Sequence, residues 1–191
     1  MEKIGDIISE QCVHRHIIKK ESQVIVAYGV TQLVFFLCNL VAIQCIAIIA
    51  HQWIASVVYC IVYASLSKLT GSYHASSRKF CFLKTIAVFS CYIFLLVIIP
   101  EKFYIIISCL GIVGYLTIIL IAVPVKQIDK VWTKKQLEKN KTKAFFLSIV
   151  YFSLSIVLSL FPDLTQYRSM IILTMFLTGI LVLCGHLFNE K

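Results

Sequence analysis

The chain has 191 residues, of which 60% are hydrophobic and only 14% are charged. Soluble globular domains carry about 25% charged residues, so this composition excludes a soluble domain and indicates an integral membrane protein. A formal net charge of +9 is also typical of nucleic-acid-binding proteins, but membrane proteins retain Lys and Arg on their cytoplasmic side. We therefore expect the lipid bilayer, and no nucleic acid, to be the partner of the basic segments.

A polar, basic arm over residues 1–23 begins the chain. Within it, Ile4, Ile7 and Ile8 recur at roughly helical spacing. This pattern predicts an amphipathic helix that lies on the inner membrane surface. The alternative is a solvated arm with scattered apolar residues.

Six apolar segments follow the arm and predict membrane-spanning helices. They cover residues 28–49, 53–69, 82–99, 103–123, 144–161 and 169–188. The second barely reaches the ~20 residues that a span needs, so the first two are also compatible with one re-entrant hairpin. The predicted fold is an all-α integral membrane protein with about six transmembrane helices (four to six). We treat residues 1–191 as a single domain, with helices one to three in 28–99 and four to six in 103–188.

The basic residues are distributed asymmetrically over the connections. If each predicted span crosses once, all but two of the 18 Lys and Arg fall on one side, and the exceptions are Lys102 and Arg168. The positive-inside rule then places both termini, the connection 68–84 and the basic loop 124–143 in the cytoplasm. We therefore expect a multi-pass protein of the cell membrane.

The connection 68–84 brings a histidine, a cysteine and several cations together outside the apolar runs. A nearby imidazole can convert a cysteine to its reactive thiolate. His74 and Cys81 are seven positions apart, so one unbroken helix would separate them by ~10.5 Å along its axis. We therefore predict that a helix begins at Ser76 or Ser77, with His74 in the loop before it and Cys81 near its first turn.

This helix start would favour the charged form of the cysteine. Helix N-termini stabilise a thiolate, and Arg78, Lys79 and Lys84 would add to the effect. The sequence names no third catalytic residue. Polar candidates for orienting the histidine are Ser72, Ser76, Gln127 and Asp129. The alternative interpretation is that His74 and Cys81 are interfacial residues with no special role.

The other cysteines and histidines predict no further site. Most cysteines lie inside apolar runs without paired spacing, where cysteine is usually a small packing residue. These are Cys38, Cys45, Cys60, Cys91, Cys109 and Cys184. The remaining histidines lack the convergent spacing of a zinc site. We therefore expect no metal and no other cofactor.

The segment Gly71-Ser72-Tyr73-His74-Ala75, followed by Cys81, resembles a signature of the AgrB family. That signature reads Gly-Gly-x-His-Ala with a Cys seven positions after the His, and its proteins are accessory gene regulator membrane peptidases of Gram-positive bacteria. The similarity extends over nearly the whole chain, including the basic arm, the multi-span layout and the lysine-rich loop after Pro124. Ser72 stands where the family has a second Gly, and Lys68 where an arginine is expected.

The resemblance implies a membrane cysteine endopeptidase of quorum sensing that cleaves an AgrD-type precursor of an autoinducing peptide. Cys81 would form a thioester acyl-enzyme, His74 would be the general base, and the product would cyclise to a thiolactone or lactone. We expect substrate contacts at Ser72, Arg78, Lys79, Lys134 and Lys135. The last two belong to a lysine cluster that could meet an acidic precursor tail. The alternative for the cluster is that it sets topology and touches anionic lipid.

Two other classes of function stay open on the sequence alone. A small peptide exporter without proteolytic activity is the first, although the spans contain only neutral polar residues such as Gln32, Asn39 and Gln44, which argues against ion-coupled transport. The second is a non-catalytic membrane scaffold. Because six short helices enclose little volume, a symmetric homodimer that shelters the substrate is a further expectation.

Overall fold

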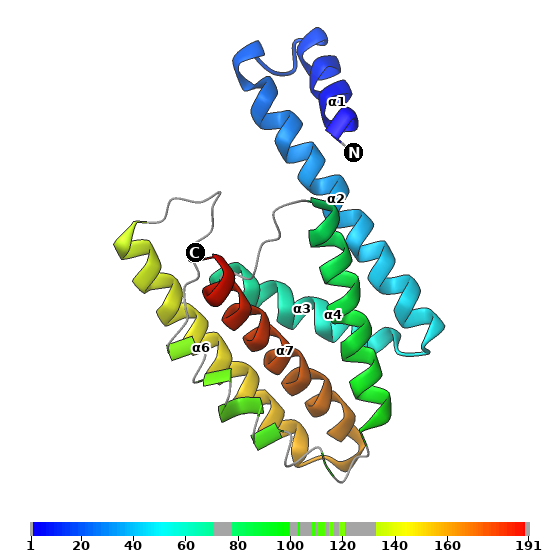
Figure 1. Ribbon diagram of the computed structural model, residues 1–191, viewed down its shortest axis with the longest axis vertical. Helices are drawn as coiled ribbons and strands as arrows, with labels where there is room; N and C mark the ends of the chain where they lie inside the picture. The colour runs from blue at the N-terminus through cyan, green and yellow to red at the C-terminus, as the bar shows by residue number, and fades with distance from the viewer. Residues whose placement is uncertain are drawn as a thin grey trace. The chain divides into compact units, whose positions relative to one another are not determined.

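The computed structural model describes residues 2–70, 78–99, 103, 108–109, 111–113, 115–116, 119–120 and 133–189. All regular structure in these residues is helical (Figure 1). The elements are α1 (Glu2–His14), η1 (Lys20–Ser22), α2 (Gln23–Ile49), α3 (Trp53–Thr70), α4 (Arg78–Ile98), α6 (Lys134–Ser159), η3 (Pro162–Leu164) and α7 (Thr165–Asn189). Five helices in the described part of the chain are long and apolar enough to cross a membrane. The prediction of an all-α membrane protein is confirmed.

Residues 1–46 form one compact unit and residues 47–191 a second. In the first unit α1 packs closely on α2 through small residues. A Cβ atom on Gly5 would lie 2.5 Å from the carbonyl oxygen of Ala27 and closer still to the hydroxyl of Thr31. α1 covers residues 2–14 of the predicted arm 1–23, and Ile4 and Ile7 are exposed on it. Its position on the membrane surface stays a prediction.

The close contact at Gly5 predicts that Gly5→Leu loosens α1 from α2. Overpacking of a tight contact costs about 1–3 kcal/mol, so we expect faster amide hydrogen exchange throughout α1 in the detergent-solubilised protein. Gly29→Leu is the matched control, because a Cβ atom there would meet nothing within 4 Å. Unchanged protection of α1 in Gly5→Leu would show that α1 does not depend on this contact.

The second unit is built around α7, which lies against α3, α4 and α6 (Figure 1). In the apolar stretch of α7 that is long enough to cross a membrane, 67% of the residues are buried inside the protein. In the other four such helices of the described residues, the buried share is 11–33%. Two buried hydroxyls of α7 are satisfied within the helix, since Thr174 and Thr178 each donate a 2.7 Å hydrogen bond to the carbonyl oxygen four residues earlier. These two threonines can therefore be surrounded by protein without leaving their hydroxyls unpaired.

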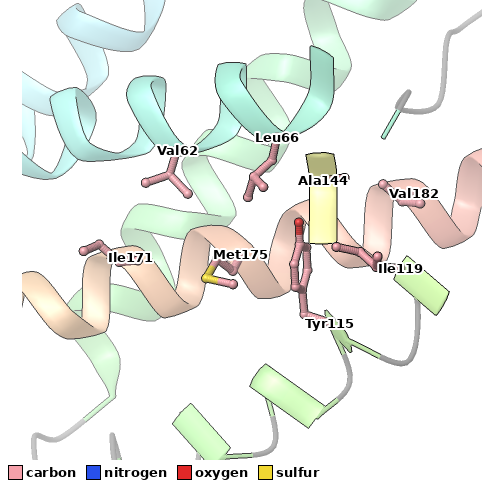
Figure 2. Packing of buried hydrophobic residues seen from close by; sticks show 8 residues of the cluster. All are labelled: Val62, Leu66, Tyr115, Ile119, Ala144, Ile171, Met175 and Val182. Atoms are coloured by element: carbon pink, nitrogen blue, oxygen red, sulfur yellow. The ribbon is translucent and has the colours of Figure 1, made fainter. Parts of the chain in front are cut away.

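The core of this unit is an apolar cluster contributed by several helices (Figure 2). Its members are Val62, Leu66, Tyr115, Ile119, Ala144, Ile171, Met175 and Val182. A polar link joins α3 to α6 beside it, because the hydroxyls of Ser65 and Tyr151 lie 2.8 Å apart and share a hydrogen bond. Hydrogen bonds between helices help to hold membrane bundles together, where burial of apolar surface gives little driving force.

Helix α6 begins at Lys134, ten residues before the predicted start at Ala144. Thr133 and Gln136 form a capping box, in which each side chain accepts a hydrogen bond from the other residue's backbone N–H. The lysines, glutamine and glutamate that follow are good helix formers. The second half of the predicted loop 124–143 is therefore helix. Most of the predicted span 103–123 lies outside the described residues.

Candidate functional site

The candidate nucleophile, Cys81, is the fourth residue of α4. Its predicted place near the first turn of this helix is confirmed, while the predicted serine cap lies outside the described residues. Phe89 and Tyr92 follow Cys81 after two and three turns on the same side of α4, and both are fully buried. Phe80 and Leu83 on the opposite side are 64% and 60% exposed. Cys81 therefore lies on the face of α4 that turns toward the helix bundle, and it is half-buried.

An aromatic cluster holds this face of α4 against α3. The ring of Tyr59 lies 5.1 Å from that of Phe89 and 5.0 Å from that of Tyr92, measured between centroids. Tyr92 also donates a 3.3 Å hydrogen bond to the carbonyl oxygen of Ala55. Aromatic pairs at these separations contribute about 0.5–1.5 kcal/mol beyond their burial. The rotation of α4, and with it the direction in which Cys81 faces, is set by these contacts.

Two residues of the next turn lie beside Cys81. Thr85 donates a 2.9 Å hydrogen bond from its hydroxyl to the Cys81 carbonyl oxygen. Lys84, also half-buried, lies three residues after Cys81, so the two side chains are neighbours on the helix surface.

The histidine of the predicted pair lies outside the described residues, as do Ser72 and Asp129. A contact between His74 and Cys81 therefore stays a prediction. Arg78 and Lys79 are the first two residues of α4, which places their backbone in the same turn as Cys81.

The lysine cluster occupies the first turns of α6. Lys134 and Lys135 begin the helix and are exposed. Lys139 and Lys143 follow Lys135 at intervals of four, so these three exposed cations form one stripe along the helix. Lys141 differs, because its Nζ donates a 2.8 Å hydrogen bond to the carbonyl oxygen of Leu120. One member of the cluster thus has a structural role that the sequence pattern did not reveal.

The described residues offer no group of three or more His, Cys, Asp or Glu side chains that could hold a metal ion. All eight cysteines are free.

Comparison with protein families gives a match to the model of accessory gene regulator B (AgrB) over residues 1–183. Comparisons with curated proteins and with solved structures each found no match. Because the family match covers nearly all of the 191 residues, the chain belongs to the accessory gene regulator B family, which takes part in agr quorum sensing through processing of the AgrD peptide.

Proposed function

We propose that this protein is a membrane cysteine endopeptidase that cleaves an AgrD-type precursor, with Cys81 as nucleophile and His74 as general base. The observation that carries the proposal is the position of Cys81. It is half-buried at the N-terminal end of α4, on the bundle-facing side, with Lys84 one turn further along the helix. Reactive cysteines typically lie in partly exposed sites near helix N-termini and basic residues.

The reaction proceeds by acyl transfer. The Cys81 thiol gives its proton to His74, and the sulfur attacks the scissile carbonyl carbon of the precursor. The carbon–nitrogen bond breaks, the departing amine takes the proton from the imidazolium, and the N-terminal fragment remains on sulfur as a thioester. A thiol or hydroxyl within that fragment then attacks the thioester, the ring closes, and Cys81 regains its proton. A partly dry site protects the thioester from hydrolysis.

The lysines at the start of α6 are proposed to meet the acidic tail of the precursor. Lys134 and Lys135 are exposed, and helical spacing aligns Lys135 with Lys139 and Lys143. Such a stripe attracts an anionic peptide over several ångströms and loses its effect at high salt. A precursor whose tail carboxylates are replaced by amides should show a raised KM and an unchanged kcat. An unchanged KM would indicate that the lysine stripe contacts lipid headgroups and does not bind the precursor tail.

The proposed setting is the cell membrane of a Gram-positive bacterium, with both termini and the start of α4 in the cytoplasm. The support for this orientation is the distribution of Lys and Arg along the sequence. A homodimer that shelters the precursor belongs to the same proposal.

The test is a cleavage assay on membranes that carry the protein, with the precursor encoded beside its gene as substrate. Mass spectrometry should detect the released C-terminal tail and a cyclic N-terminal product. A short-lived adduct on the Cys81-containing peptide, removed by hydroxylamine, should identify the thioester. An intact precursor in the presence of correctly inserted protein would count against the peptidase and favour the exporter.

A further inference from the structure

Lys84 is an unusual residue for its place in α4. It lies inside the membrane-spanning window Phe80–Ile98, and it is the one charged residue in that stretch of sequence. Charged side chains within membrane helices are costly and rare, and they generally mark functional sites. A cation at this position therefore calls for a partner or a role.

The structure supplies a partner on the same helix. Lys84 lies three residues after Cys81, one turn further along α4, so the two side chains are neighbours on the helix surface. Both side chains are half-buried. In such a partly dry environment an electrostatic interaction between neighbouring groups is screened far less than in water.

The competing role for Lys84 is extension toward the lipid headgroups, which long side chains near helix ends often adopt. The burial of the side chain argues against full extension. Lys84 is half-buried, as Cys81 and Thr85 are, whereas Phe80 and Leu83 are exposed. Lys84 therefore lies at the border between the exposed and buried sides of α4, and its side chain is partly covered by the protein.

We propose that Lys84 is a positioning residue for the reaction, whose ammonium group holds Cys81 in its thiolate form and directs the sulfur toward the substrate. The inference rests on the proposed function, and it deepens the assignment of Cys81. During activation the thiol proton passes to His74, and the Lys84 side chain stabilises the thiolate that forms. An opposite charge at close range commonly favours the ionised form of a group by about tenfold or more. The N-terminal end of α4 acts in the same direction.

The test measures the thiol directly and needs no precursor. The full-length protein in detergent is treated with iodoacetamide over a range of pH, and alkylation of the Cys81-containing peptide is followed by mass spectrometry. Lys84→Met keeps the length and apolar stem of the side chain and removes its charge. We expect alkylation near pH 7 to slow about tenfold and the midpoint of the rate profile to move to higher pH. Lys84→Arg should restore the wild-type profile to within about twofold, because the charge returns.

Two features of the experiment separate an electrostatic role from a structural one. Cys12, in α1, is an internal control whose alkylation should not change in either variant. At strongly alkaline pH every thiol is ionised, so the Cys81 rates of wild type and Lys84→Met should converge. Rates that stay apart at alkaline pH, or profiles that coincide at all pH values, would overturn the assignment.

The outcome is also independent of the cleavage assay. If the membranes fail to cleave the precursor but Lys84→Met still slows alkylation, the peptidase proposal fails while the effect of Lys84 on the thiol stands. If cleavage occurs and alkylation does not depend on Lys84, the peptidase stands and Lys84 has no part in thiolate formation.

Discussion

Replacing Cys81 with alanine should lower the rate of precursor cleavage by at least about a thousandfold, because removal of a catalytic nucleophile leaves only binding and residual electrostatic stabilisation. Thr85, one turn further along α4, is not free to take over, since it already donates its hydroxyl to the Cys81 carbonyl oxygen. The measurement is mass spectrometry of both precursor fragments, made on membranes with equal amounts of inserted protein.

The matched control for this variant lies on the same helix. Cys91 is exposed on α4, ten residues after Cys81, and Cys91→Ala should cleave the precursor as wild type does. Cys81→Ser tests the chemistry further, since a hydroxyl in this environment remains protonated and should give little product. Full activity in Cys81→Ala would make the start of α4 a structural segment, and an export function would then explain the chain better.

The spans were predictable because a bilayer imposes a strict rule on sequence. A helix that crosses it needs a long apolar run, and such runs are visible without any knowledge of packing. The start of α3 at Trp53 agrees with the predicted one, and its end at Thr70 is one residue beyond. The start of α2 at Gln23 precedes the predicted Tyr28, because the apolar residues 24–27 continue the same helix.

The basic first part of α6, residues 134–143, was predicted less well. Charged residues outside a span indicate a loop in a hydropathy profile, although lysine, glutamate and glutamine are good helix formers in water. The capping box of Thr133 and Gln136 was the available signal, since a threonine followed three residues later by glutamine marks a helix start. The close packing of α1 on α2 could not be predicted in the same way, because a single glycine such as Gly5 does not indicate which other helix it will contact.

At the candidate site, the sequence predicted that Cys81 lies near the start of α4, but it did not predict toward which side of the helix the residue faces. α4 is apolar on nearly all sides, so periodicity cannot tell the lipid-facing side from the bundle-facing side. That direction depends on contacts between distant residues, such as the hydrogen bond from Tyr92 to Ala55 and the ring contacts of Tyr59. Lys84 is the exception, because a lone charge in an apolar run is visible in the sequence and suggests a role there.

Replacing His74 with alanine should reduce precursor cleavage about a hundredfold to a thousandfold near pH 7, the range that loss of a general base commonly produces. The loss should be smaller than that of Cys81→Ala, since the nucleophilic sulfur is still present and solvent can accept its proton. His14→Ala, in the last turn of α1, is the control and should leave cleavage unchanged.

The pH dependence of His74→Ala distinguishes a base from a residue that merely supports the fold. Solution hydroxide can remove the thiol proton when no base is present, so the variant should recover part of its activity above about pH 8.5, where an ordinary thiol ionises. Recovery should be seen in kcat/KM from initial rates of tail release between pH 6 and 10, a range chosen to lie about two units around the ordinary thiol value. A deficit that stays constant across this range would show that His74 is not the group that deprotonates Cys81. In that case the thiolate would be formed by Lys84 and the helix terminus alone, and His74 would act later, as the acid that protonates the departing amine.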